Sequence, residues 1–323
     1  MGSLPSTLRR SAAVLVLLAA AACSAGTGPA VTGSGATPAA SGSGPLTAEI
    51  SQFRDNYSKQ IIEIQLTNTT GEAVTVLAAG LRSPLFANEI NWTSAPAGTE
   101  LPPGQTKSLP TRLPGAVCPN PAPQPGEASQ PGQPAPYGSE PAEPGAVVEV
   151  RVTPAAGTPE RTLTATAADP FGVLPRNNAE MCVAQAAVAV AGFRLSPRLE
   201  VSADARSAVL RLVITPRNPA GAGGGSSGTL TIDSIGGTTL LEEDTSAPWP
   251  SGLRVDAAGP VHEVRLGIRP ARCDPHAVAE DKVGTLIPLQ VTVGGREGTL
   301  KIDAGAQLRG RIYDFVTSAC GRQ

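Results

Sequence analysis

Two copies of one pattern of short apolar runs occur in this chain, and this duplication limits its fold more than any other feature of the sequence. In residues 62–66 apolar side chains alternate with polar ones, which is the period of a strand with one buried face. Similar runs follow in the same order in both copies, separated by connections of different length. The matched segments are 51–54 and 191–194, 62–67 and 210–215, 74–76 and 230–232, 113–118 and 268–273, 150–153 and 289–292, and 162–163 and 299–300.

Regularly spaced short strands with Gly, Pro and Asn between them are typical of antiparallel β-sandwiches. We therefore predict an all-β fold of two tandem immunoglobulin-like antiparallel β-sandwiches, over residues 46–185 and 186–323. Aromatic residues make up only 3% of the chain, so the cores must consist mainly of Val, Leu, Ile and Ala. Residues 175–182 and 312–320 are each expected to hold a short helical turn. Because almost no linker separates the copies, we expect the two domains to touch end to end.

Four of the five cysteines belong to the repeated pattern. Four cysteines allow three pairings, and the repeat selects one disulfide per domain, Cys118 with Cys182 and Cys273 with Cys320. By the loop-entropy relation each disulfide stabilises its domain by about 4 kcal/mol. A metal site is the competing interpretation, but no Cys-x-x-Cys motif occurs and the chain has only two histidines.

The N-terminal segment has the features of an export signal. Arg9 and Arg10 precede an unbroken apolar run, residues 12–22, which is too short to cross a membrane as a helix. The end of this run and the next residue, Ala-Ala-Ala-Cys, resemble the lipobox of bacterial lipoproteins, with Ala in place of the usual Leu three residues before the Cys. The resemblance implies that residues 1–22 are a signal peptide and that Cys23 becomes the lipidated first residue of the mature protein.

Residues 24–45 contain only Ser, Gly, Ala, Thr, Pro and Val, with no charge and no periodic apolar face. With Cys23 they form a lipidated, flexible tether over residues 23–45, with a reach of about 25 Å. More than one acyl chain on Cys23 would anchor the protein stably. We therefore expect a location on the extracytoplasmic face of the cell membrane, with the membrane bound through the lipid on Cys23.

After Cys118 the first domain carries residues 119–145, which are dense in Pro, Gln, Gly and Glu. This composition cannot bury a core, so we predict a Pro-rich surface loop. The formal net charge of −2 provides no basic field for nucleic acid, and no nucleic-acid partner is expected.

No stretch of the chain has the context that a catalytic motif requires. Residues 224–228 match Gly-x-Ser-x-Gly and residues 223–228 match Gly-x-Gly-x-x-Gly, but both matches lie in one Gly/Ser-rich run. Each motif needs a helix after it, whereas the strand-like residues 229–235 follow here. We predict that the protein is not an enzyme and has no cofactor.

The most polar cluster in the chain contains Asp274, His276, Glu280 and Asp281. Carboxylates with a histidine suit a divalent cation, although the spacing matches no calcium loop. In the second interpretation Asp274 caps a helical turn that begins at Pro275, and the acidic side chains are solvated or paired with arginine.

The sequence therefore predicts an exported lipoprotein that acts as a non-catalytic interaction or structural module of the cell envelope. Its partner would be an unknown envelope protein or a wall polymer. The alternative is an accessory protein that binds a small ligand or a divalent metal, at the interdomain junction or in the 274–282 loop.

Overall fold

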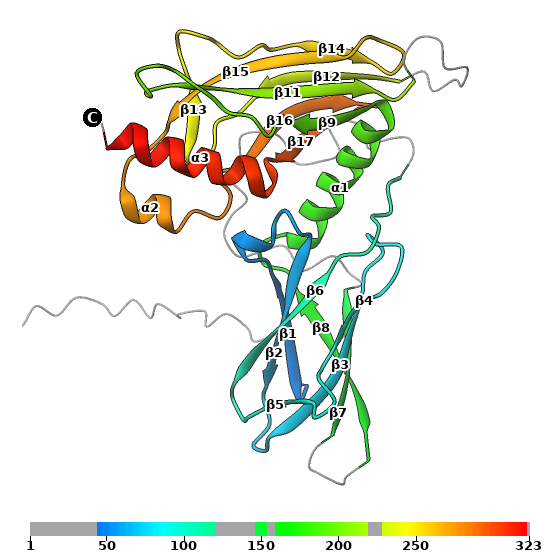
Figure 1. Cartoon of the computed structure of the whole chain (residues 1–323). Coiled ribbons are helices and arrows are strands. Elements are labelled where there is room, and N and C mark those ends of the chain that lie inside the picture. Colours follow the sequence, from blue (N-terminus) through cyan, green and yellow to red (C-terminus); the bar gives the residue numbers. More distant parts are fainter. Residues whose placement is uncertain (1–43, 120–145, 154–158, 219–227, 322–323) are drawn as a thin grey trace, which may run out of the picture. The chain divides into compact units, whose positions relative to one another are not determined.

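Two β-rich halves follow one another in the computed structural model, which describes residues 44–119, 146–153, 159–218 and 228–321 (Figure 1). Both halves belong to one compact unit, Gly42–Gln323. Cys23, the tether up to residue 43 and residues 120–145 of the Pro-rich loop lie outside the described residues. None of the helices in the described ranges is long and apolar enough to cross a membrane.

The first half consists of one sheet that nearly closes on itself. Its path is β4-β3-β7-β8-β1-β2-β6, with β5 paired beside β3. Strand β8 connects the β4-β3-β7 part of the sheet to the β1-β2-β6 part, because it pairs antiparallel with β7 and parallel with β1. The hydroxyl of Thr111 in β6 donates to the backbone oxygen of Asn91 in β4 and brings the two ends of the path together. The strands are β1 (Leu46–Ser51), β2 (Ile61–Asn68), β3 (Val74–Arg82), β4 (Ile90–Thr93), β5 (Thr99–Leu101), β6 (Thr106–Arg112), β7 (Val147–Thr153) and β8 (Arg161–Ala168).

The second half consists of two separate sheets and two helices. One sheet has the order β10-β11-β15-β13, with β9 also paired to β11, and the other has the order β14-β12-β16-β17. Helix α2 (Pro275–Ala279) is short, and helix α3 (Gly305–Cys320) packs beside it (Figure 1). The strands are β9 (Ala191–Leu195), β10 (Glu200–Val201), β11 (Ala208–Pro216), β12 (Thr229–Ile235), β13 (Leu241–Glu243), β14 (Leu253–Asp256), β15 (His262–Pro270), β16 (Leu286–Val293) and β17 (Arg296–Asp303).

Alternating side chains of these strands form the two cores, as the sequence period predicts. Ile62, Ile64 and Leu66 of β2 are fully buried in the first core, and Leu210 and Leu212 of β11 are fully buried in the second. Each such side chain contributes about 1.5–3 kcal/mol by leaving water. The cores are aliphatic because the chain has few aromatic residues to offer.

The pairing registers of the two halves agree with the duplication. In each half the central ladder shifts register at one place, between Val76 and Ala78 in β3 and between Ile232 and Ser234 in β12. A bulge at the same position of both copies indicates that the strands themselves are equivalent, since bulges redirect a strand locally. Equivalent pairs are Val76–Val152 and Ile232–Val291, Val150–Leu163 and Leu289–Leu300, and Ile64–Leu109 and Leu212–Val264.

The predicted β-rich class is confirmed, but two tandem immunoglobulin-like sandwiches are not. The first half is a single, nearly closed sheet rather than two facing sheets. The halves also differ in one strand: β4 pairs with β3, whereas β13, at the same place in the chain order, pairs with β15 in the opposite sheet. The sequence period shows which faces are buried, but it does not show which neighbour a short edge strand chooses.

The predicted match between residues 51–54 and 191–194 is wrong in register. Ile50 pairs with Ile64, and Leu195 pairs with Leu212, the counterpart of Ile64. Ile50 therefore corresponds to Leu195. The match between the two segments depends on Phe53 and Phe193, but Phe53 lies beyond the end of β1.

Helix α1 (Val173–Val190) runs through the predicted boundary at residues 185–186 and is longer than the expected helical turn. Its first residues, Val173 and Leu174, belong to the core of the first half. Further along, Val183, Ala187 and Val190 belong to the core of the second half, and β9 follows directly. One helix thus contributes side chains to both cores.

Both disulfides that the repeat predicts are present. Cys118 and Cys182 join the chain after β6 to helix α1, with a Cα–Cα distance of 5.5 Å. Cys273 and Cys320 join the chain after β15 to the end of α3, with a Cα–Cα distance of 5.3 Å. Because β6 and β15 are equivalent strands, each disulfide links equivalent elements.

Candidate functional site

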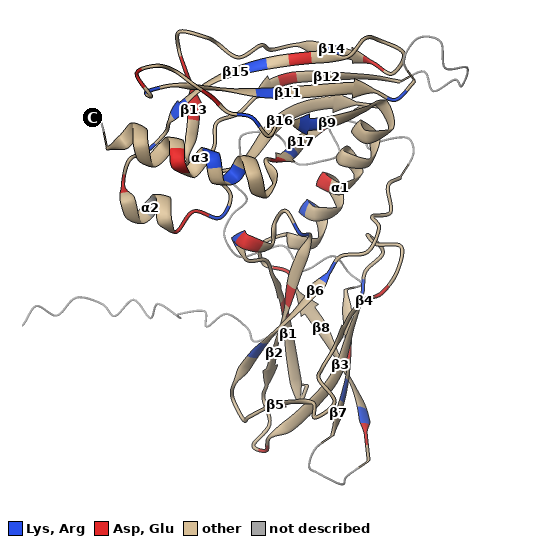
Figure 2. Ribbon diagram, viewed as in Figure 1, with Lys and Arg blue, Asp and Glu red and all other residues tan. Residues whose placement is uncertain are grey.

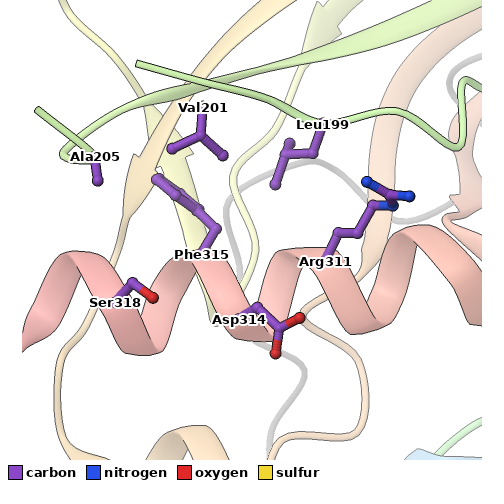
Figure 3. A pocket seen from close by; sticks show the side chains of 7 residues that line it. All are labelled: Leu199, Val201, Ala205, Arg311, Asp314, Phe315 and Ser318. Atoms are coloured by element: carbon purple, nitrogen blue, oxygen red, sulfur yellow. The ribbon is translucent and has the colours of Figure 1, made fainter. Parts of the chain in front are cut away.

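A hollow of about 300 Å³ opens between strand β10 and helix α3 (Figure 3). In Figure 3 the ring of Phe315 points from α3 toward Val201, so the two side chains form the floor and one wall. Polar side chains of α3 lie at the same opening. The lining residues are Leu199, Val201, Ala205, Arg311, Asp314, Phe315 and Ser318.

The helical period explains why α3 offers both an apolar floor and a polar rim. The buried residues of α3 recur at spacings of three and four, which places them on one face of the helix. Phe315 lies at the edge of that face, and the exposed Arg311 and Asp314 lie beside it. The hollow therefore opens where the buried face of α3 meets its solvent face.

Val201 is the apolar side chain most exposed at this hollow, at 48%. Its pairing partner, Ala208 of β11, is almost fully buried, so Val201 lies on the inner face of the sheet. A side chain on an inner face is normally covered. Val201 is half exposed because β10 is an edge strand of only two residues.

The backbone of Ala205 is strained at the same place. Ala205 and Gln60 are the non-glycine residues with positive φ in the described ranges, and the φ of Ala205 is 57°. A left-handed backbone costs an L-residue about 1–2 kcal/mol, a cost that glycine avoids. The methyl group of Ala205 lines the hollow, and glycine would remove it. Ala205 lies in the turn between β10 and β11, and a left-handed residue is common in such turns.

A second hollow of about 410 Å³ lies next to the first, since two of its lining residues neighbour lining residues of the first in the chain. Its lining includes Arg206, which follows Ala205 in the chain, and Ala319, which follows Ser318. We call the two hollows together the α3 groove; Arg269 and Pro270 complete its lining. From Arg311 to Ala319 the helix rises about 12 Å, which sets the length of the groove.

The charged lining of the α3 groove is mainly basic, with three arginines and one aspartate. Arg269 is paired with Glu242 at 3.2 Å. In the part of the chain that the structure describes, the side chains of Arg206, Arg311 and Asp314 form no ion pair or hydrogen bond. Figure 2 shows these opposite charges of α3 on the same helix.

A network in the β10–β11 turn holds Arg206 in place at one end of the groove. Asp204 accepts hydrogen bonds from the hydroxyl of Ser202 at 2.6 Å and from the backbone N–H of Arg206 at 3.0 Å. The bond from Ser202, followed by the bond from Arg206, holds the pKa of Asp204 below its usual value. The charged carboxylate therefore fixes the turn at neutral pH.

The predicted cation candidates do not come together as a metal site. No group of three His, Cys, Asp or Glu side chains in the described ranges is close enough to hold a metal ion. Asp281 instead accepts hydrogen bonds from Tyr313 Oη at 3.0 Å, from Gly284 N at 2.8 Å and from the hydroxyl of Thr239. The backbone oxygens of Asp274 and His276 accept bonds from Val278 and Glu280 in and after helix α2.

These contacts attach the connection before β16 to helix α3. Burial first, and then the hydrogen bond to Asp281, raise the pKa of Tyr313 to about 12. Tyr313 thus stays a neutral donor over the physiological range. Asp281 has a structural role, because it holds the connection before β16 against α3.

The junction between the halves holds a smaller hollow of about 140 Å³, near the 3₁₀ turn η1 (Arg54–Asn56). Glu180 of α1 and Lys301 of β17 are paired there at 2.7 Å. Lys301 Nζ and Arg176 Cζ each lie 5.6 Å from the centroid of the Tyr57 ring. Because the charged groups at this junction are already partnered, they favour cohesion between α1 and β17 over a ligand site.

Sequence reasoning did not identify the α3 groove. Its residues come from two segments, 199–206 and 269–319, that only folding brings together. One local signal was present: Leu199 and Val201 alternate with charged residues in a run too short to be read as a strand. Cys23 and most of the Gly/Ser run at 223–228 lie outside the described residues.

No protein-family model matches this chain, and no curated protein matches it. The crystal structure of the YadV chaperone aligns with 76% of this chain and 93% of its own, at 13% identity and a TM-score of 0.18. A chain of a chaperone–tip adhesin complex of CFA/I fimbriae biogenesis aligns with 75% of this chain and 91% of its own, at 6% identity and a TM-score of 0.13. TM-scores this low carry no argument about this chain.

Proposed function

We propose that this chain is a membrane-anchored extracytoplasmic lipoprotein and a non-catalytic interaction module of the cell envelope, which binds a protein partner in the α3 groove. The observation that carries the binding site is Val201, a half-exposed side chain on an inner sheet face beside the floor formed by Phe315. The anchor rests on the lipobox-like residues that end at Cys23.

The energetic argument is the burial of a partner side chain in the groove. A Leu or Phe side chain that moves from water into such a hollow contributes about 1.5–3 kcal/mol. Apolar anchors in pockets of this kind dominate the affinity of many protein interfaces. An exposed Val201 side chain keeps apolar surface in contact with water, which is unfavourable. A partner that covers this side chain removes that unfavourable contact.

The finer architecture is part of the same proposal. Each half is a variant of an immunoglobulin-like sandwich, in which β1-β2-β6 and β9-β11-β15 are equivalent, as are β3-β7-β8 and β12-β16-β17. The equivalent registers and bulges support this. The two sheets are joined through β8 and β1 in the first half and are separate in the second half, where the α3 groove lies.

Co-purification from cells with Val201→Asp and Val261→Asp variants tests the proposed binding site. Val261 is a matched control, since it is 57% exposed and lies just before β15, outside the groove. A protein that co-purifies with the wild-type chain is expected to be lost with Val201→Asp and retained with Val261→Asp. Equal loss with both variants, or no co-purifying protein, contradicts the proposal. Circular dichroism checks that both variants fold.

The anchor is tested separately by labelled palmitate and the Cys23→Ala variant. Wild-type protein is expected to carry the label and to sediment with membranes, and the variant to do neither. A variant that stays in the membrane fraction contradicts the anchor but not the groove.

A further inference from the structure

We infer that the α3 groove binds an extended peptide segment of its partner, whose apolar centre is flanked on both sides by acidic residues. This inference rests on the proposed function, because it specifies the partner of the same groove. Three features of the groove lead to it: an open strand edge, the length of the groove, and two arginines at its ends.

Strand β10 is an edge strand that borders the groove. Ser202 N donates to Ser207 O at 2.9 Å, so these residues form a hydrogen-bonded pair of the β10–β11 ladder. Hydrogen-bonded positions alternate in an antiparallel ladder, so the N–H and C=O of Val201 point away from β11. No described residue outside the ladder bonds to them. Strand β10 has two residues, so this edge offers one backbone pairing position, at Val201.

An extended segment fits this edge better than a helix does. The backbone groups of a helix are satisfied within the helix, so a docked helix would leave the N–H and C=O of Val201 without partners. A strand pairs with both groups and directs alternate side chains toward Leu199 and Phe315. The groove is about 12 Å long, which corresponds to about four extended residues.

The arginines determine the flanks of the bound segment. Arg311 lies at one end of the groove and Arg206 at the other, and neither has an ion pair within the described residues. The nearby carboxylate of Asp204 interacts with the charge of Arg206, but its hydrogen bonds go to the Ser202 hydroxyl and to the backbone N–H of Arg206. A carboxylate at each end of the segment would pair with them, since guanidinium groups bind carboxylates in a bidentate geometry. Asp314 lies between the two ends and would repel an acidic residue at the centre. The segment is therefore acidic at both flanks and apolar between them.

The test uses the full-length lipidated chain in nanodiscs of phosphatidylcholine, a lipid without net charge. Three fluorescent peptides share a Val-Leu-Val centre and carry Glu, Gln or Lys at both flanks, and their binding is measured by fluorescence anisotropy. We expect the Glu peptide to bind at least tenfold more tightly than the Lys peptide. The Arg206→Glu/Arg311→Glu variant should reverse this order. The Arg54→Glu/Arg112→Glu variant is the control, because it makes the same charge change at exposed residues of the first half.

A fourth peptide tests the extended conformation. It is the Glu peptide with an N-methyl group on its central residue, which removes one backbone donor and should weaken binding at least tenfold. Unchanged affinity of this peptide overturns the strand pairing. Equal affinity of the Glu, Gln and Lys peptides, or an order that the arginine variant leaves unchanged, overturns the acidic flanks.

Two outcomes separate this inference from the proposed function. If none of the peptides binds while the partner still depends on Val201, the inference is wrong and the groove remains a binding site. If none binds and the partner does not depend on Val201, both are wrong.

Discussion

Replacing Ala205 with glycine should stabilise the second half of the protein while weakening its groove. The φ of Ala205 is 57°, a conformation that costs an L-residue about 1–2 kcal/mol. Glycine loses about 0.5–1 kcal/mol more than alanine in backbone entropy on folding. The net expected gain is about 0.5–1 kcal/mol in the free energy of unfolding. At a typical urea dependence this raises the midpoint by about 0.3–0.5 M.

The measurement is urea unfolding followed by tryptophan fluorescence in a Trp92→Phe background. Trp249 is then the remaining tryptophan, and it packs against the core of the second half. The Glu-flanked peptide should bind the Ala205→Gly variant about fourfold more weakly, because the loss of one methyl group from the lining removes about 0.8 kcal/mol.

Gln60→Gly is the matched control, since the φ of Gln60 is 53° and Gln60 lies in the first half. It should leave peptide binding and the unfolding that Trp249 reports unchanged. It should raise the urea midpoint of the first half, which Trp92 reports in a Trp249→Phe background. An Ala205→Gly variant with an unchanged or lower urea midpoint would refute the strain argument. An unchanged affinity for the peptide would show that the methyl group does not contribute to the groove.

Three further predictions concern helices α1 and α3. Gly298→Val should lower the free energy of unfolding by about 1–3 kcal/mol, because a Cβ there would lie 2.9 Å from Val183 Cγ2 of α1; Val183→Ala should restore part of the loss in urea unfolding. Asp169→Ala should cost about 0.5–2 kcal/mol in thermal unfolding, because Asp169 accepts the N–H groups of the first residues of α1, at 2.7 and 2.8 Å. In absorbance titration one tyrosine should ionise near pH 12, and Tyr313→Phe should abolish this step.

The sign of the tyrosine effect on stability follows from the raised pKa. The pKa of Tyr313 is about 12 in the folded chain, against about 10 in an unfolded one. Its neutral hydroxyl therefore stabilises the fold fully below pH 10, and this contribution is lost as the pH rises through 12. A Tyr313→Phe variant should show a smaller loss of stability over this range.

The strands and both disulfides were predictable because they follow from local alternation and from its repetition. Ile64 and Leu212 occupy the same register position, and each is the centre of an alternating run. The disulfide pairs follow from the same comparison, without any knowledge of distance. These are features that two tandem copies must share.

Helix α1 was harder to predict because it serves two cores. Leu174 faces the first core, whereas Val183 and Ala187 face the second, so the apolar residues do not form the single stripe that indicates an amphipathic helix. The length of the helix and its position across the domain boundary followed from this double burial. Neither copy of the repeat contains that information alone.

The α3 groove was not predictable from local sequence because its parts are distant in the chain. Val201 belongs to a strand of two residues, and Phe315 has the spacing of an ordinary core residue. Only the fold shows that α3 leaves Val201 half exposed. By contrast, the acidic 274–282 loop stood out in the sequence, yet Asp281 serves to hold Tyr313.

The central claim is that a protein partner occupies the α3 groove, and site-specific photo-crosslinking in living cells tests it most directly. A photoreactive amino acid placed at Val201 or at Val261 reports what lies within a few ångströms of each exposed position. We predict one discrete adduct from position 201 that is absent from position 261. The same adducts from both positions, or none from position 201, would contradict the claim.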